Sequence, residues 1–354
     1  MTLVAWEELR YSKNAVRKAG ELIGQGNGTL DEIDDARTKL SNFRSSHGYP
    51  LLSITMHVRG NAIAVKPDAV VARRLKRLPT ILDKLERYPR MNVTTMQDLG
   101  GCRVILSTVA QVDAVVRRLE NAGRAQNTIV RKYDYLRDAP GPQSSGYRGV
   151  HLVYEYRATK KAYHGHKVEV QIRTELQHAW ATAVETMDLF GGGRLKYSEA
   201  DPGIARYFLV VSSLMALDEE LTQPTEAALD IERLRGELAA LEVEHAVLQR
   251  LSGFTAVVES FGPQMRNSTL VMELFRDKGE LYVSRFDTVG EAQERLASLE
   301  ARNDENIDAV LIGMTKFDQL QAAYPNYFAN TTAFSNFVNG MLNGYMPERA
   351  VRWQ

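Results

Sequence analysis

Residues 168–173, Val168-Glu169-Val170-Gln171-Ile172-Arg173, form the stretch that decides the fold. Apolar β-branched residues alternate there with polar ones, and this period of two is typical of a β-strand with one buried face. Upstream, β-branched runs at 102–106 and 149–156 alternate with amphipathic helical patterns at 78–87 and 109–122, and a third such pattern follows at 175–187. This interleaving predicts an α/β (α+β) domain in which helices cover a sheet.

The pattern changes on both sides of this domain. Residues 1–48 predict two helices, broken by glycines at 24–28, and the α/β domain occupies residues 49–200. Residues 201–254 predict a helical connector, whose apolar stripe at 231–248 either packs on the preceding domain or forms a dimerising coiled coil. Residues 255–354 predict a small α+β domain with a hairpin at 269–286, a helix at 291–302, a strand at 308–312 and two short helices.

The composition is that of a globular protein without disulfides. One cysteine in 354 residues excludes a disulfide framework and a thiolate zinc cluster, and it fits a reducing cytoplasm. Residues 1–13 lack the apolar run of a signal peptide, and the longest apolar stretch, 207–217, is too short to cross a bilayer. The sequence therefore predicts a cytoplasmic protein without a membrane partner.

The charge of the chain is balanced overall but not locally. The sequence has 44 Lys and Arg against 44 Asp and Glu. Residues 71–90 contain seven basic and two acidic residues, whereas residues 218–244 contain nine acidic and two basic ones. A net charge of zero is uncommon for a nucleic-acid-binding protein, but the basic segment keeps RNA open as a partner.

Two carboxylates stand out by their positions. Asp98 precedes the run at 102–106, and Glu169 shares one strand face with Gln171 and Arg173. Carboxylates brought together from two strands could hold Mg²⁺ together with substrate phosphates. Alternatively, Glu169 and Arg173 form a surface ion pair on an exposed face.

Two further segments could bind a nucleotide. Arg74, Lys76 and Lys84, with Thr80 among them, could contact phosphates, or they could simply form a solvated surface. In the loop 144–151, Tyr147 offers a face on which a base could stack. Arg148 and His151 could contact phosphate or ribose in the same loop, whereas the pair His164 and His166 has no further metal ligands nearby.

Together these segments resemble the synthetase domain of the RelA/SpoT family of pyrophosphokinases. The resemblance covers residues 50–200 and implies a nucleotidyltransferase-like mixed sheet flanked by helices. It also implies a transferase that moves the β,γ-diphosphate of ATP to a ribose 3′-hydroxyl. Five motifs carry it in the family's order: Arg74-x-Lys76 with Thr80 and Lys84; Asp98-Leu-Gly-Gly-Cys-Arg103; Tyr133-Asp134-Tyr135; Gly146-Tyr147-Arg148-Gly149-Val150-His151; and Glu169-Val-Gln171-Ile-Arg173-Thr174 leading into His178-Ala-Trp180.

The resemblance assigns roles to individual residues. It implies that Asp98 and Glu169 are catalytic and coordinate Mg²⁺, and that Tyr147 stacks on the acceptor base. The implied ATP site holds the adenine between two arginines and the phosphates against a threonine and two lysines: Arg74, Arg103, Lys76, Thr80 and Lys84. The implied acceptor site adds Arg148, His151, Gln171, Arg131 and Lys132 to Tyr147. His178 and Trp180 are expected to brace the site.

The acceptor motif departs from the alarmone synthetases of the family. Tyr133 stands where those enzymes usually have a lysine, which places the binding of GDP or GTP in doubt. The loop at 147–151 is more similar to that of the toxic small synthetases, which pyrophosphorylate the 3′ CCA end of tRNA and stop translation. A (p)ppGpp synthetase acting on GDP or GTP, and an inactive nucleotide-binding regulator, are the alternatives.

Residues 255–354 suggest how such an enzyme could be controlled. Tyr324-Pro325-Asn326-Tyr327 resembles the neutralising Tyr-x-x-Tyr motif of CapRel-type fused toxin–antitoxin proteins in phage defence. By this resemblance Tyr324 and Tyr327 are autoinhibitory: they block the ATP site until a phage protein binds, and cation–π contacts with Arg74 and Arg103 would favour such a state. Alternatively, the two tyrosines pack the end of a helix.

Overall fold

The computed structural model describes residues 6–122, 127–137, 141–190, 202–251, 269–275, 280–286, 307–313 and 331–344, and single residues between 288 and 304. The chain divides into two compact units. The first comprises residues 1–106, 110–133 and 150–172, and the second comprises residues 107–109, 134–149 and 173–354. Tyr324 and Tyr327 lie outside the described residues.

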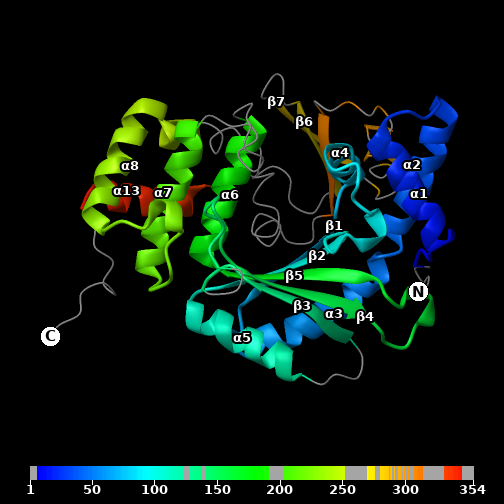
Figure 1. Cartoon of the computed structure of the whole chain (residues 1–354), viewed down its shortest axis with the longest axis horizontal. Helices are drawn as coiled ribbons and strands as arrows, with labels where there is room; N and C mark the ends of the chain where they lie inside the picture. The colour runs from blue at the N-terminus through cyan, green and yellow to red at the C-terminus, as the bar shows by residue number, and fades with distance from the viewer. Residues whose placement is uncertain are drawn as a thin grey trace. The chain divides into compact units, whose positions relative to one another are not determined.

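A mixed five-stranded sheet organises the first unit. Its strand order is β1-β2-β5-β4-β3, with β1 at Val70–Leu75, β2 at Gly100–Leu106, β3 at Asn127–Asp134, β4 at Val150–Tyr156 and β5 at Lys167–Thr174. β1 pairs with β2, and β4 with β5, in antiparallel ladders. Figure 1 shows α3 (Gly48–Ile63) and α5 (Val109–Asn121) together on one face of this sheet. The predicted mixed sheet flanked by helices is confirmed.

The sheet has one apolar face and one polar face. Cys102 and Val104 of β2 and Val168 and Val170 of β5 are at most 1% exposed. Gly100, in the same alternating register, approaches Leu51 of α3, so this face packs against α3. Because side chains alternate along a strand, the intervening polar residues occupy the opposite face, where the helix α4 (Leu78–Arg87) connects β1 to β2.

The two predicted N-terminal helices are present as α1 (Lys13–Gln25) and α2 (Leu30–Ser45). Ser12 caps α1, and Thr29 caps α2 in a capping box with Glu32, so local sequence defines both starts. Gly26 ends α1 in a left-handed conformation with φ 64°. The glycines that interrupt the sequence pattern are therefore the turn between two helices.

Three elements were not expected from the sequence. α3 is apolar on most sides, so it lacks the periodic stripe of a surface helix. In β1, Arg73 and Arg74 are exposed, and two adjacent charges are more typical of a loop than of a strand. β3 is likewise mostly polar, and both β1 and β3 are edge strands of the sheet.

Helices dominate the second unit. α6 (Glu175–Phe190), α7 (Pro202–Asp218), α8 (Ile231–His245) and the C-terminal α13 (Thr332–Leu342) share one apolar core. Leu234 and Leu238 of α8 are fully buried in it, so the middle of the predicted apolar stripe packs within the unit. Phe334 of α13 is also fully buried, with its ring centroid 5.5 Å from that of Phe208 in α7.

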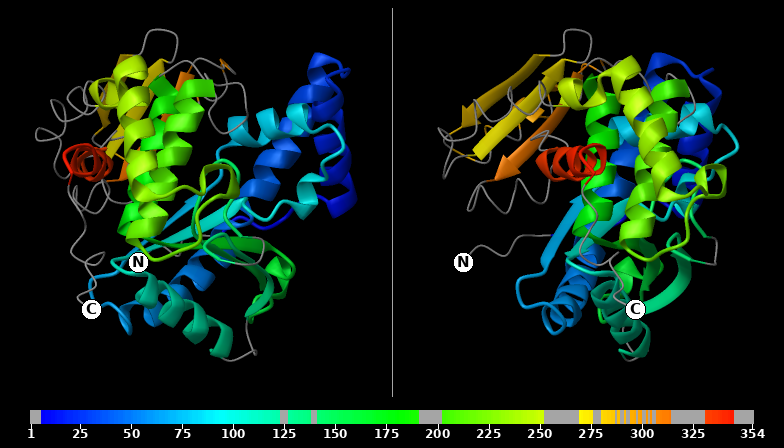
Figure 2. Two further views of the ribbon diagram at one scale, coloured as in Figure 1. Left: turned by 60° about the vertical axis from the view of Figure 1, so that its left-hand side comes forward. Right: turned by 90° about the vertical axis from the view of Figure 1, so that its left-hand side faces the viewer.

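The second unit also contains a three-stranded sheet. Its order is β7-β6-β8, with β6 at Thr269–Phe275, β7 at Glu280–Phe286 and β8 at Ile307–Gly313 (Figure 2). The antiparallel pairing of β6 with β7 confirms the predicted hairpin. Glu273 of β6, 3% exposed, accepts two hydrogen bonds from Arg295 at 2.9 and 2.7 Å. No helix in the described parts of the chain is both long and apolar enough to span a membrane.

Candidate active site

The first unit places two arginines of the implied ATP site on one sheet face. In the β1–β2 ladder, Arg74 lies opposite Gly101, and Ala72 lies opposite Arg103. Directly opposed residues share a face, so Arg74 and Arg103 are diagonal neighbours on the same side of the sheet. Gly101 adds no side chain between them. The pairing brings together two guanidinium groups from positions 29 residues apart, as a site for a flat aromatic base would require.

A carboxylate paired with two lysines lies next to these arginines in the chain. The Oδ2 atom of Asp98, just before β2, is 2.8 Å from Nζ of Lys76 and 3.5 Å from Nζ of Lys84 on α4. All three side chains are 20–31% exposed, and Thr80 is half-buried on the same helix. Burial favours protonation of Asp98, but the two ammonium groups outweigh it and hold its pKa below the usual value.

The backbone fixes Lys76 in this position. Its N–H donates to the carbonyl of Leu99 at 2.8 Å, and its own carbonyl accepts from Nε of Arg44 at 2.6 Å. Arg44 comes from the last turn of α2, which explains why the two N-terminal helices belong to the same unit as the site. Arg44 carries no signal in the sequence that would have singled it out.

The second carboxylate, Glu169, lies on β5. His151 Nδ1 is 3.2 Å from one of its oxygens, and Gln171 Nε2 donates to the other at 2.8 Å. His151 lies opposite Gln171 in the β4–β5 ladder, so the three side chains share the polar face. Burial disfavours the charge on Glu169, but the bonds from His151 and Gln171 hold its pKa below the usual value. The partners of Glu169 are thus these two residues and not Arg173.

The two carboxylates fit a Mg²⁺ ion. The charge of Asp98 acts on Glu169 and opposes its ionisation, so the two groups are near neighbours in the unit. Both are held as carboxylates, the hard oxygen ligands that Mg²⁺ takes in pairs beside substrate phosphates. Cations on one side and carboxylates on the other form an arrangement that can bind a metal–polyphosphate complex.

Tyr133 forms the edge of this site on β3. Its hydroxyl donates to Oε1 of Gln97 at 3.3 Å and accepts from Nη1 of Arg131 at 3.2 Å. The hydrogen bond from Arg131 lowers the pKa of the Tyr133 hydroxyl. Lys132, on the opposite face of β3, pairs instead with Glu120 of α5 at 2.9 Å. Of the two predicted acceptor cations on β3, the structure brings only Arg131 to the side of Tyr133.

The second unit holds the loop with Tyr147. Tyr147 is half-buried, and its ring meets that of Tyr135 edge to face at 5.9 Å between centroids. Arg148 is 3% exposed, and burial lowers its pKa to about 10, so it stays charged at neutral pH. Its guanidinium donates to Ser212 and to the carbonyl of Thr222. Arg148 therefore points into the interior of its unit, which the sequence did not indicate.

Two other residues that the sequence analysis names, Trp180 and His166, have structural partners. Trp180 of α6 is buried, and its indole N–H donates to the carbonyl of Phe208 in α7 at 2.8 Å. His166 is buried, with Nε2 2.8 Å from Oγ of Ser46 and Nδ1 3.0 Å from the carbonyl of Tyr163. Trp180 thus links α6 to α7, and His166 serves the packing of the first unit.

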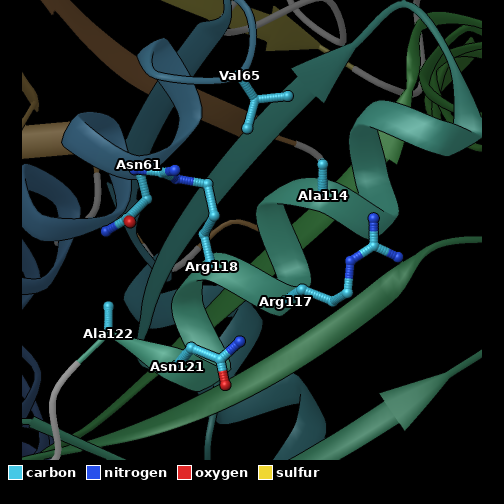
Figure 3. Close-up of a pocket in the computed structure, with 7 residues that line it drawn as sticks. All are labelled: Asn61, Val65, Ala114, Arg117, Arg118, Asn121 and Ala122. Carbon is cyan, nitrogen blue, oxygen red and sulfur yellow. The ribbon is translucent and has the colours of Figure 1, made fainter.

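A shallow pocket lies elsewhere in the first unit. It measures about 580 Å³ and is lined by Asn61, Val65, Ala114, Arg117, Arg118, Asn121 and Ala122. Figure 3 shows Arg118 reaching toward Asn61 while Arg117 points away. These residues belong to α3, α5 and the turns after them, on the apolar side of the sheet. None of the predicted site residues lines this pocket.

Comparison with known proteins agrees with the motifs. Residues 73–188 match the family model described as "Region found in RelA / SpoT proteins". This part of the chain is therefore similar to that region. It spans β1 to α6 and therefore includes every predicted ATP-site and acceptor-site residue. The match agrees with the family resemblance of the sequence motifs.

Other comparisons give weaker similarity over a longer stretch. The uncharacterized protein Rv1366 of Mycobacterium tuberculosis is 27% identical over 197 residues, which cover 55% of this chain and 65% of the relative. Among solved structures, small alarmone synthetase 1 of Bacillus subtilis bound to its product pppGpp gives a TM-score of 0.43 at 24% identity. That match covers 56% of this chain and 97% of the synthetase. Small alarmone synthetase 2 of the same organism gives 0.42 at 20% identity, covering 51% and 94%.

Proposed function

We propose that this chain is an ATP-dependent pyrophosphokinase that transfers the β,γ-diphosphate of ATP to the 3′-hydroxyl of the tRNA CCA end. The observation that carries the proposal is the polar sheet face of the RelA/SpoT region, where two ionised carboxylates stand beside paired cations. Phosphoryl transfer depends on positioning and charge neutralisation more than on covalent chemistry, and this face offers both.

The roles of the residues follow from their charges. Arg74 and Arg103 hold the adenine, while Lys76 and Lys84 turn from Asp98 to the ATP phosphates and neutralise them. Mg²⁺, held by Asp98 and Glu169, would polarise the phosphoryl group when bound. Glu169 accepts the proton of the 3′-hydroxyl as that oxygen bonds to the β-phosphorus. The bond between this phosphorus and the α,β-bridging oxygen breaks, and AMP leaves with the electron pair.

The choice of tRNA as the acceptor rests on the uncharged side chain of Tyr133. A guanosine nucleotide brings a 5′-polyphosphate, for which the site would need a free cation. Tyr133 offers a neutral hydroxyl there, and its hydrogen bonds engage Gln97 and Arg131. The 3′-terminal nucleotide of an RNA carries a single 5′-phosphodiester charge in place of a polyphosphate, so it needs less positive charge there. The second candidate is a (p)ppGpp synthetase, which Arg131 favours because its guanidinium is exposed beside Tyr133.

One assay separates the candidates. The full chain carrying Tyr324→Ala and Tyr327→Ala is incubated with γ-labelled ATP and offered tRNA, GDP and GTP together. Label on tRNA, absent when the tRNA ends in a 3′-deoxyadenosine, is the expected result. Label on GDP or GTP alone would favour the alarmone synthetase. Binding of an ATP analogue, together with no transfer of label from ATP to any acceptor, would favour the inactive regulator.

The full chain is preferable to a truncated one. Phe334, Val338 and Met341 of α13 are at most 1% exposed and pack in the core shared with α6, α7 and α8. Removing the C-terminal residues would expose this surface and remove contacts from helices that adjoin the Tyr147 loop. Substituting the two tyrosines keeps α13 in the chain.

We further propose that residues 255–354 autoinhibit the enzyme through Tyr324 and Tyr327, and that a phage protein releases them. The proposal rests on the Tyr-x-x-Tyr motif alone. Expression of the Tyr324→Ala, Tyr327→Ala chain should arrest growth, and adding Glu169→Gln should restore it. Normal growth of cells that contain the double variant, shown to be active in vitro, would contradict autoinhibition.

A further inference from the structure

The loop that carries Tyr147 is fastened to α7 by one hydroxyl group. Oγ of Ser212 donates to the carbonyl of Gly146 at 2.6 Å and accepts from Nε of Arg148 at 3.3 Å. Ser212 is 1% exposed in the middle of α7, and Gly146 and Arg148 directly precede and follow Tyr147. A single buried side chain thus holds both neighbours of the predicted stacking residue.

Close packing at Gly146 supports this contact. Gly146 has φ 87°, a conformation that side chains other than glycine's rarely adopt. A Cβ atom added there would lie 3.0 Å from both Cβ of Ser212 and Cζ2 of Trp180. The loop backbone therefore lies directly against α6 and α7, and Trp180 links these helices through its bond to Phe208.

Arg148 extends the attachment beyond α7. Its guanidinium donates to the carbonyl of Thr222 and interacts with the charge of Glu219, just after α7. Glu219 in turn accepts from Nε2 of Gln177 at 2.7 Å and from the hydroxyl of Thr174. The loop is thereby tied to the end of β5, the start of α6 and both the middle and the end of α7.

We infer that Ser212 is a positioning residue that orders the Tyr147 loop for the acceptor, so that α7 is part of the acceptor-binding apparatus and not only a connector. The inference rests on the proposed function for the role of Tyr147. It assigns a task to a helix at Pro202–Asp218, beyond the matched residues 73–188. Without the hydroxyl, the Gly146 carbonyl and the Arg148 guanidinium both lose a buried partner, and the loop should leave its position more often.

The neighbouring Ser213 supplies a matched control. It lies on the same helix, is fully buried and has no hydrogen-bond partner for its hydroxyl in the described structure. Ser212→Ala and Ser213→Ala remove the same atom from the same helix. Only the first removes a bond to the loop, so a general effect on α7 would appear in both variants.

Two measurements on the full chain carrying Tyr324→Ala and Tyr327→Ala test the inference. Amide hydrogen exchange should become about tenfold faster at residues 145–149 in Ser212→Ala and stay unchanged in Ser213→Ala. In steady-state kinetics, Ser212→Ala should raise KM for the acceptor about tenfold while KM for ATP stays the same. Equal exchange in the two variants, or an unchanged acceptor KM, would overturn the positioning role.

The exchange measurement also separates this inference from the proposed function. It requires no acceptor and no turnover. If the chain transferred label to no acceptor, the proposed function would fail, and exchange at residues 145–149 would still decide whether Ser212 orders the loop.

Discussion

Two buried histidines should make the first unit sensitive to mild acid. His47, at the junction of α2 and α3, and His166, before β5, are at most 3% exposed, and their ring centroids are 4.5 Å apart. Burial lowers the pKa of His47 to about 3, with a further contribution from His166, and it lowers the pKa of His166 to about 4. Both imidazoles are therefore neutral in the native protein at neutral pH.

The sign and size of the effect follow from linkage. In the unfolded chain a histidine takes up a proton near pH 6.5, which the buried ring cannot do until the pH is far lower. Stability is complete above pH 6.5 and is lost as the pH falls from there toward the native values. At pH 5.5 each buried histidine should lower the unfolding free energy of the protein by about 1.4 kcal/mol, and the pair should lower it by about 3 kcal/mol.

Urea unfolding at pH 7.5 and 5.5 measures this loss. His166→Asn should lower the unfolding free energy at both pH values. The further decrease in its unfolding free energy from pH 7.5 to pH 5.5 should be about 1.4 kcal/mol smaller than the decrease in the unmodified chain. His164→Asn is the control, since His164 is exposed two residues away, and it should keep the full loss. A pH dependence that is the same in all three proteins would refute the assignment of the acid sensitivity to the buried rings.

Three further predictions concern the site and the core. Glu169→Gln should lower the transfer rate at least about 100-fold in a rate assay; a smaller loss would exclude Glu169 as the base. The affinity for Mn²⁺, measured by electron paramagnetic resonance, should rise about tenfold when an ATP analogue is present. Without the analogue, Lys76 and Lys84 pair with Asp98, and the phosphates should draw the two lysines away from this carboxylate. Equal Mn²⁺ affinity with and without the analogue would contradict this competition. Phe334→Ala should lower the unfolding free energy, measured by urea unfolding, by about 4 kcal/mol, because the ring is fully buried against α7. A decrease below about 1 kcal/mol would show that α13 contributes little to the stability of the core.

Most of the sheet could be predicted because its central strands carry strong local signals. β5 alternates apolar and polar residues, and β2 and β4 contain short apolar runs, so both kinds of local pattern indicate a strand. The edge strands β1 and β3 lack the signal because their pairing on one side leaves them partly solvated and tolerant of charge. α3 was missed for the opposite reason, since a mostly apolar helix has no stripe to detect.

The residue types of the candidate site were also accessible from the sequence. Asp98, Lys76 and Lys84 lie close together in the folded chain because the elements that carry them are short and follow one another. Glu169 and Gln171 lie on one face of β5 because side chains alternate along a strand. Arg131 and Lys132 are adjacent cations in the sequence, which does not indicate which face of the sheet each one occupies. The placement of β3 in the sheet sends one to the side of Tyr133 and the other to Glu120.

What the sequence by itself determined is therefore the set of chemical groups and their order along the chain, since strand periodicity and motif spacing are local properties. Which partners those groups meet was decided only by the tertiary structure. Arg148 turns inward to Ser212 and Thr222, and His47 meets His166 across 119 positions. Contacts between distant segments depend on how helices and strands pack, and no local pattern records that packing.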